Sequence, residues 1–363
     1  MKSALFAIAL AAAVTSGNAQ TLNVEQGNVT YQFASDCGDM TYTDNGQSLT
    51  IQGKTFNVSE ITKMTVDETT VVKNNVSIEY SGSTAKVIVA GNVAQYVTAT
   101  VSGAHVTVNQ TNTADVDSAE ITYLLSGNSS DGEFYMASGK YKCTVQLAGL
   151  TLTNPSGAAI TVMNSKRIQL SAKNGTVNTL ADGSGSQKAC VYSKGQLQLQ
   201  GNGTLNVTGN YKHAIKSASY ITVKNLTLNI TSAIGDGINC EEYMLVKSGT
   251  VKISGVGDDG IQCDYGDSEN LTGETKDHDD EDSGNIYLEG GTINVNVTAT
   301  AAKCLKADGL IRMEGGALTL TAAGAIDLTD TSDPSYTAGV KAADFQQDGG
   351  TIGITVTGTA GRG

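Results

Sequence analysis

The sequence predicts an all-β fold, a parallel β-helix built from coils of short strands, with a small β domain in front of it. The 363 residues include 42 glycines and only 2 prolines among many threonines and valines, and both glycine and β-branched residues disfavour long helices. Similar units recur about every 23 residues from Ala158 onward, which is typical of a solenoid. Within each unit apolar and polar residues alternate, as they do in a strand with one buried face.

Residues 1–19 are predicted to be a secretory signal peptide. Lys2 precedes an apolar run, and the small residues Gly17 and Ala19 stand where a signal peptidase prefers them. No later stretch of about 20 apolar residues could span a bilayer. We therefore expect a secreted, cell-surface or periplasmic protein that does not insert into a membrane.

Residues 20–114 lack the 23-residue period and contain turn signals such as Asp44-Asn45-Gly46, so they are predicted to form a small N-terminal β domain. Residues 115–363 are predicted to form the β-helix. The sequence ends at Gly363, one residue before the next unit is due. This leaves open the alternative that the chain is a fragment whose last coil is exposed.

An apolar anchor position defines the alignment of the units. The anchors are Val191, Ile215, Ile238, Ile261, Leu305 and Val340, with Ile160 in an earlier coil. Stacking of the coils turns each aligned position into a row, with neighbours about 4.8 Å apart. One inward row holds small residues, including Cys240 and Cys263 as direct neighbours. A disulfide and a pair of packed thiols both remain open, and packed thiols are favoured because side chains in one parallel ladder point the same way.

The net charge of −13 at pH 7 excludes some classes of partner. A strongly acidic protein repels nucleic-acid phosphates and anionic lipids, so neither is expected to bind. Cations and neutral surfaces remain. No P-loop, Rossmann glycine set or Gly-x-Ser-x-Gly elbow is present.

Two stacked carboxylates suggest a cation site. The row just before the anchor strand contains Asp236 and Asp259, and Asp258 is adjacent to the second of them. Stacked carboxylates repel each other unless a cation lies between them, and Ca²⁺ accepts hard oxygen ligands of this kind. The alternative is an ordinary surface charge ladder, because His213 and Lys303 bracket the pair in the same row.

A second acidic row lies on the other side of the short strand and includes Glu241 and Asp264. An acidic insertion, residues 264–283, follows the strand that carries Asp264. It is either a solvated segment or a loop that folds back and completes a calcium shell through Asp280, Glu281 or Asp282. Oxygen-only ligands argue against zinc.

An outward row between the two acidic rows is the candidate binding surface for sugar. It contains Tyr192, Lys216, Asn239, Gln262 and Lys306. Amides, lysines and a tyrosine in register suit the hydroxyls and carboxylates of a glycan, although solvated strands also look like this. We expect these positions to be exposed, so that truncation of Asn239 and Gln262 weakens glycan binding and leaves stability nearly unchanged.

Several motifs in order resemble a known family over residues 121–363. They are Gly235-Asp236-Gly237-Ile238, Gly257-Asp258-Asp259-Gly260-Ile261-Gln262-Cys263-Asp264, the acidic insertion from His278 to Tyr287, and the glycine pairs at Gly290 and Gly315. The chain resembles secreted bacterial carbohydrate-binding domain proteins, which are right-handed parallel β-helices related in fold to pectate lyases. The resemblance implies calcium held by Asp236, Asp258, Asp259, Asp264 and residues 280–282. It also implies affinity for an acidic polysaccharide such as pectin or polygalacturonate.

Three functions compete. The leading one is non-catalytic, calcium-dependent binding of acidic polysaccharide, with no catalytic residue. The second is a calcium-dependent polysaccharide lyase that acts by β-elimination, with Lys303 or Lys306 as the base. The third is a structural adhesin or spacer. A monomer is expected, while the glycan, the number of ions and the role of residues 20–114 stay open.

Overall fold

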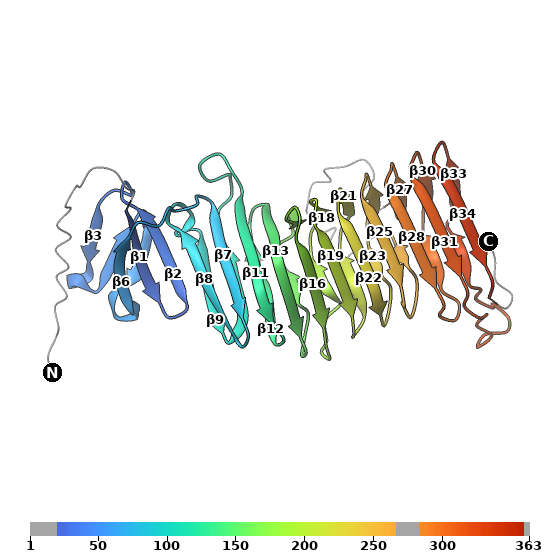
Figure 1. Cartoon of the computed structure of the whole chain (residues 1–363), viewed down its shortest axis with the longest axis horizontal. Helices are drawn as coiled ribbons and strands as arrows, with labels where there is room; N and C mark the ends of the chain where they lie inside the picture. The colour runs from blue at the N-terminus through green and yellow to red at the C-terminus, as the bar shows by residue number, and fades with distance from the viewer. Residues whose placement is uncertain (1–19, 266–282, 359–363) are drawn as a thin grey trace.

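The computed structural model describes residues 20–265 and 283–358, and it confirms the predicted parallel β-helix. Short strands stack side by side along one long axis, with the first and the last of the described strands at opposite ends (Figure 1). Each repeating coil contributes three strands, and successive coils pair in parallel on all three faces. The predicted signal peptide, residues 1–19, and residues 280–282 of the insertion lie outside the described residues.

The first face is a ten-stranded sheet that carries the predicted anchors. Its strands are β9 (Val97–Ser102), β10 (Ala104–Gln110), β12 (Gly132–Gly139), β14 (Ile160–Val162), β17 (Ala189–Ser193), β20 (His213–Ser217), β23 (Ile238–Cys240), β26 (Ile261–Cys263), β29 (Lys303–Ala307) and β32 (Ala338–Lys341). Every anchor pairs with the next one, from Ile160 through to Val340. The alignment read from the sequence is therefore the register of this sheet.

The other two faces complete each coil. The second face contains β11 (Ile121–Ser129), β13 (Cys143–Asn154), β15 (Ile168–Ala172), β18 (Leu197–Gln200), β21 (Ile221–Lys224), β24 (Tyr243–Val246), β27 (Asn285–Leu288), β30 (Leu310–Met313) and β33 (Asp344–Gln347). The third face contains β16 (Val177–Asp182), β19 (Thr204–Gly209), β22 (Thr227–Ala233), β25 (Thr250–Ser254), β28 (Thr292–Val297), β31 (Ala317–Ala322) and β34 (Thr351–Val356). The long strand β13 pairs with both β15 and β16 and so joins the two faces.

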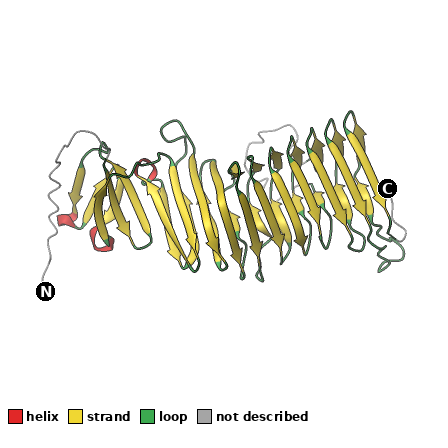
Figure 2. Ribbon diagram, viewed as in Figure 1, coloured by secondary structure: helices red, strands yellow, loops and turns green. Residues whose placement is uncertain are grey.

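The N-terminal part mixes parallel and antiparallel strands. Its larger sheet contains β1 (Thr21–Gln26), β2 (Val29–Ala34), β6 (Lys63–Asp67), β7 (Asn75–Ser81) and β8 (Thr84–Ala90), and its small antiparallel sheet contains β3 (Met40–Thr43), β4 (Ser48–Ile51) and β5 (Lys54–Asn57). Short 3₁₀ turns, red in Figure 2, are η1 (Asp44–Gly46), η2 (Val58–Glu60) and η3 (Gly91–Val93). Because β7 pairs with β11 and β10 pairs with β12, sheet hydrogen bonds cross residue 114. The division into two domains there stays a prediction.

Apolar side chains fill the solenoid along its length. One cluster of buried hydrophobic residues runs from Leu22 to Ala322. Corners between the second and third faces use glycines in a left-handed conformation; at Gly291 (φ 84°) and Gly316 (φ 85°) an added Cβ would also come within 2.8 Å of the preceding coil's carbonyl oxygen. Glycine is therefore required at these corners for both conformation and space.

All six cysteines are free, so Cys240 and Cys263 form the expected stack of packed thiols. Burial raises the pKa of the Cys263 thiol well above its ordinary value. The described part of the chain contains no helix with the length and hydrophobicity of a membrane-spanning segment.

Candidate functional site

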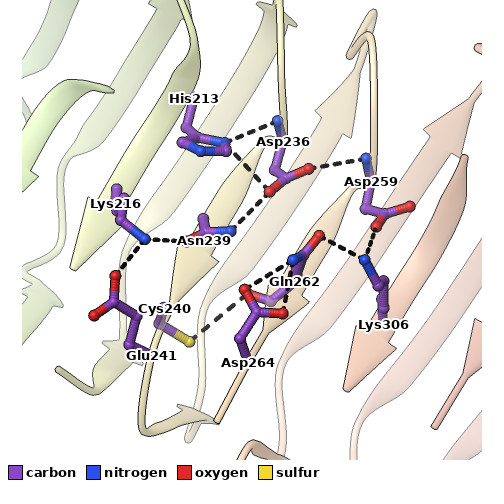
Figure 3. Close-up of polar contacts among 10 residues, drawn as sticks. All are labelled: His213, Lys216, Asp236, Asn239, Cys240, Glu241, Asp259, Gln262, Asp264 and Lys306. Atoms are coloured by element: carbon purple, nitrogen blue, oxygen red, sulfur yellow. Dashed lines mark hydrogen bonds and ion pairs between the residues drawn. The ribbon is translucent and has the colours of Figure 1, made fainter. Parts of the chain in front are cut away.

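A ladder of hydrogen bonds runs along the row that precedes the first-face strands (Figure 3). The backbone N–H of Asp236 donates to His213 Nδ1 over 3.1 Å, and the backbone N–H of Asp259 donates to Asp236 Oδ1 over 3.1 Å. The backbone N–H of Lys303 continues the ladder by donating to Asp259 Oδ1 over 2.7 Å. Each side chain thus accepts the amide of the next coil, which gives both aspartates a structural role.

Glycine follows each of these aspartates for a steric reason. A Cβ on Gly237 would lie 2.6 Å from the carbonyl oxygen of Gly260, and a Cβ on Gly260 would lie 2.3 Å from Val295 Cγ1. Coils can stack this closely only if the residue after the aspartate has no side chain. The Asp-Gly pairs therefore fix the position of both carboxylates.

Asp236, Asp258 and Asp259 come together as predicted, with one candidate ligand oxygen from each lying within 4.8 Å of the others. Asp236 and Asp259 are buried, while Asp258 is exposed. We call these three residues the carboxylate cluster. Asp259 Oδ2 is buried and accepts no hydrogen bond from the described residues, although Lys306 Nζ lies 3.2 Å away as an ion-pair partner. This oxygen has lone-pair capacity left for a cation.

The pKa values of the cluster reflect burial and mutual repulsion. Burial raises the pKa of Asp259, and burial together with the charge of Asp236 raises the pKa of Asp258. For Asp236 burial acts in the same direction, but the hydrogen bonds that its carboxylate accepts from the Asn239 amide and the Asp259 backbone N–H, with His213 beside it, together outweigh burial and lower the pKa. His213 Nδ1 lies 3.2 Å from Asp236 Oδ2.

Two lysines border the cluster and differ in their electrostatics. Burial lowers the pKa of Lys303, whose ammonium donates to Ser335 Oγ over 3.1 Å. Burial also acts to lower the pKa of Lys306, but the charge of Asp259 outweighs it and raises the pKa. The interpretation of His213 and Lys303 as surface residues is wrong, because each is only 8% exposed. The segment around Ser335 contacts Lys303, but it lies outside the 23-residue repeat, so the sequence does not predict that Lys303 is buried.

The predicted outward row exists, and its residues pair in register from β17 to β29. Its polar groups bond one another along the face (Figure 3). Lys216 Nζ donates to Asn239 Oδ1 over 2.6 Å, and Asn239 Nδ2 donates to Asp236 Oδ2 over 2.8 Å. One coil further on, Lys306 Nζ donates to Gln262 Oε1 over 3.0 Å.

The expected exposure of this row is wrong at Asn239, which is 3% exposed. Neighbours in adjacent coils cover this amide, and the period-2 pattern within one strand does not report them. Tyr192, Gln262 and Lys306 are half-buried. A glycan on this face would therefore contact a network that is already internally bonded.

The second acidic row takes part in the same network rather than in the carboxylate cluster. Glu241 pairs with Lys216 over 2.7 Å, and Asp264 accepts both hydrogen bonds of the Gln262 amide, at 2.7 and 2.8 Å. Within the described part of the chain, neither joins the group of carboxylates close enough to share an ion. Their role as metal ligands stays a prediction, as does that of Asp280, Glu281 and Asp282.

Comparisons with known proteins agree with the resemblance seen in the sequence. The family described as "Carbohydrate-binding domain-containing protein" matches residues 102–361. A curated protein with that description from Acetivibrio thermocellus is 25% identical over 111 residues, which cover 28% of this chain and 39% of that protein. This chain thus spans about two fifths of that relative's length. A solved structure of the polysaccharide lyase-like protein from C. thermocellum, a gadolinium derivative, has 19% identity and a TM-score of 0.48, covering 78% of this chain and 96% of that one.

Proposed function

Since the chain belongs to the family of carbohydrate-binding domain-containing proteins, we propose that it binds an acidic polysaccharide of the pectin or polygalacturonate kind with the help of calcium. The observation that carries the calcium proposal is the carboxylate cluster, with its buried oxygen that accepts no hydrogen bond from the described residues. In the outward row beside it, the half-buried Gln262 amide and Lys306 ammonium would contact sugar hydroxyls and carboxylates. We also propose secretion through the signal sequence at residues 1–19, and a monomeric protein.

Calcium fits the donor set of the cluster. Carboxylate oxygens are the ligands that Ca²⁺ prefers, and the ion takes about six to eight of them, so the glycan and water would complete the shell. Asp258 and Asp259 Oδ2 would hold the ion, with Asp236 beside them. The ion would also reverse the local charge of a protein at −13, so that uronate carboxylates are attracted rather than repelled.

The proposal is tested most cleanly at Asp258, which is exposed and whose side chain makes no hydrogen bond or ion pair within the described residues. Asp258→Asn should weaken calcium binding at least tenfold in a calorimetric titration, because it removes charge from the shell without breaking the ladder. Polygalacturonate pull-down in calcium should fall in parallel. Asp39→Asn, an exposed change far along the chain, is the matched control.

Two results would count against this function. Unchanged calcium affinity in Asp258→Asn would place the ion elsewhere, with residues 280–282 next to be tested. Equal pull-down of polygalacturonate in calcium and in chelator would remove calcium from the binding step. A protein that binds calcium but no glycan would favour the spacer function instead.

A polysaccharide lyase is the second candidate, because burial lowers the pKa of Lys303 beside the carboxylate cluster. A lysine with a lowered pKa can accept the proton next to a uronate carboxylate and so start β-elimination. Lys306 is the less suitable candidate, since Asp259 raises its pKa and keeps it protonated, so that it cannot accept a further proton. Binding without catalysis remains the first proposal because Lys303 is 8% exposed and bonded to Ser335. Ultraviolet absorbance from an unsaturated product, lost in Lys303→Met, would reverse this order.

A further inference from the structure

A shallow groove lies on the first face, before the carboxylate cluster along the chain. It has a volume of about 380 Å³, within the range of small-ligand sites. Residues from β14, β17 and the segments next to them line it: Thr161, Met163, Gln187, Lys188, Tyr192 and Lys194. None of these residues belongs to the carboxylate cluster, and only Tyr192 belongs to the outward row.

The groove carries two lysines that form no ion pair with an acidic side chain of the described residues. Lys188 and Lys194 are both exposed, and neither has an ion-pair partner within residues 20–265 and 283–358. Lys216, one coil further along, contrasts with them because Glu241 neutralises it over 2.7 Å. Two unpaired lysines on a chain with net charge −13 favour an anionic ligand at this place.

The walls of the groove suit a sugar ring. Tyr192, which stands between Lys188 and Lys194 in the sequence, is half-buried. Lys188 Nζ lies 5.5 Å from the centre of the Tyr192 ring. Met163, 37% exposed, adds apolar surface. The Gln187 amide donates to Asp182 Oδ2 over 2.9 Å and to the Gly183 carbonyl over 2.7 Å, which fixes this wall in place.

The groove and the carboxylate cluster face the same side of the solenoid. Tyr192 pairs with Lys216, and Lys216 pairs with Asn239, which bonds Asp236 of the cluster. Two strand spacings, about 10 Å, separate the strand of Tyr192 from that of Asn239. A glycan that runs along the solenoid axis would reach both places.

We propose that this groove binds one uronic acid residue of the glycan directly, without calcium. The carboxylate pairs with Lys188 and Lys194, and the sugar ring packs on Tyr192. This proposal rests on the proposed function, and it divides glycan binding into two parts, one that depends on calcium at the cluster and one that depends on lysine at the groove.

Calorimetric titration of the full chain with trigalacturonate in chelator isolates the groove. The parent protein should bind, and binding should weaken as salt rises. Lys188→Gln/Lys194→Gln should lower the affinity at least tenfold, whereas Lys173→Gln/Lys224→Gln, two exposed lysines outside the first-face strands, should not change it. Tyr192→Ala should also weaken binding, and Tyr192→Phe should retain it, because the ring rather than the hydroxyl makes the contact.

The outcomes separate this proposal from the proposed function. The Lys188/Lys194 variant should keep the gain in polygalacturonate binding that calcium gives, and Asp258→Asn should keep the binding measured in chelator. If the parent does not bind trigalacturonate in chelator but binds polygalacturonate in calcium, the groove proposal fails and the proposed function stands. Equal binding of the neutral methyl ester of trigalacturonate, or of the double lysine variant, would also overturn it. If neither condition gives binding, both fail.

Discussion

The groove and the carboxylate cluster occupy equivalent positions in different coils, and their charges are opposite. The position three residues before the anchor is Lys188 in the coil of β17 and Asp258 in the coil of β26. The position three residues after it is Lys194 in the first and Asp264 in the second. The backbone repeats while the charge of the side chains changes along the face, so a residue's place in the coil does not determine its charge.

The two regions also differ in how far their polar groups are already bonded. Around Asn239 and Gln262, amides, ammonium groups and carboxylates of four successive coils bond one another. Around Tyr192 the lysines have no acidic partner among the described residues. The first region therefore holds its carboxylates in a bonded network, whereas the lysines of the second keep their ammonium groups outside any ion pair within the described residues. Substitution of a polar side chain should therefore lower the unfolding free energy more in the first region than in the second.

The largest effect is expected at Lys306. Lys306→Met leaves the buried carboxylate of Asp259 without its ammonium partner, which should cost about 2 to 4 kcal/mol of unfolding free energy in chelator. This is somewhat less than for a fully buried pair, because 27% of the lysine side chain is exposed. Calcium affinity should rise, since the ammonium 3.2 Å from Asp259 Oδ2 no longer competes with the ion. Urea unfolding and calorimetry measure the two effects.

Lys63→Met is the matched control for Lys306→Met. It breaks the exposed pair with Glu25, at 3.5 Å, and should cost less than about 1 kcal/mol. If Lys306→Met has the same calcium affinity as the parent, the ion does not lie beside Asp259.

The next effect is expected at Asn239. Asn239→Ala removes a buried amide that bonds both Asp236 and Lys216, so it should cost about 1 to 3 kcal/mol. Asn229→Ala is the control, because within the described residues that half-buried amide bonds only Asn206, over 2.9 Å, and the change should cost less. Equal urea midpoints for the two variants would mean that the network around Asn239 adds no rigidity.

Sequence reasoning gave the coil, the anchor register and the meeting of Asp236 with Asp259, because all three follow from a repeat that can be aligned by eye. It gave the wrong exposure for Asn239 and Lys303, whose cover comes from other coils and from the segment around Ser335. It also missed the groove. Lys188 and Lys194 are ordinary surface residues in sequence, and what distinguishes them from Lys216 is that neither forms an ion pair within the described residues, whereas Lys216 pairs with Glu241.

The pH dependence of stability should show the burial of the carboxylate cluster and the repulsion within it. Because the pKa values of Asp258 and Asp259 are raised above the ordinary value of 3.8, these groups favour the folded state when protonated, and their contribution is lost as pH rises through the raised values. Asp236, with a lowered pKa, acts in the opposite sense and loses its contribution only at lower pH. Calcium binds the ionised carboxylates, and these form as pH rises through the raised pKa values. The rise in melting temperature caused by calcium should therefore increase between about pH 4 and pH 7. A calcium effect that does not change over this interval would contradict a site at the cluster.

The smallest effect on stability is expected in the groove, and it completes the comparison. Lys188→Gln/Lys194→Gln removes two exposed charges that have no acidic partner among the described residues, so unfolding free energy should change by less than about 0.5 kcal/mol. The sign should be slightly unfavourable, because the chain already carries −13 and loses two positive charges. Lys216→Gln, which breaks the pair with Glu241 and the bond to Asn239, should cost more under the same urea titration. A double lysine variant destabilised as strongly as Lys216→Gln would mean that the lysines of the groove stabilise the coil itself, and the contrast between an open region and a bonded one would not hold.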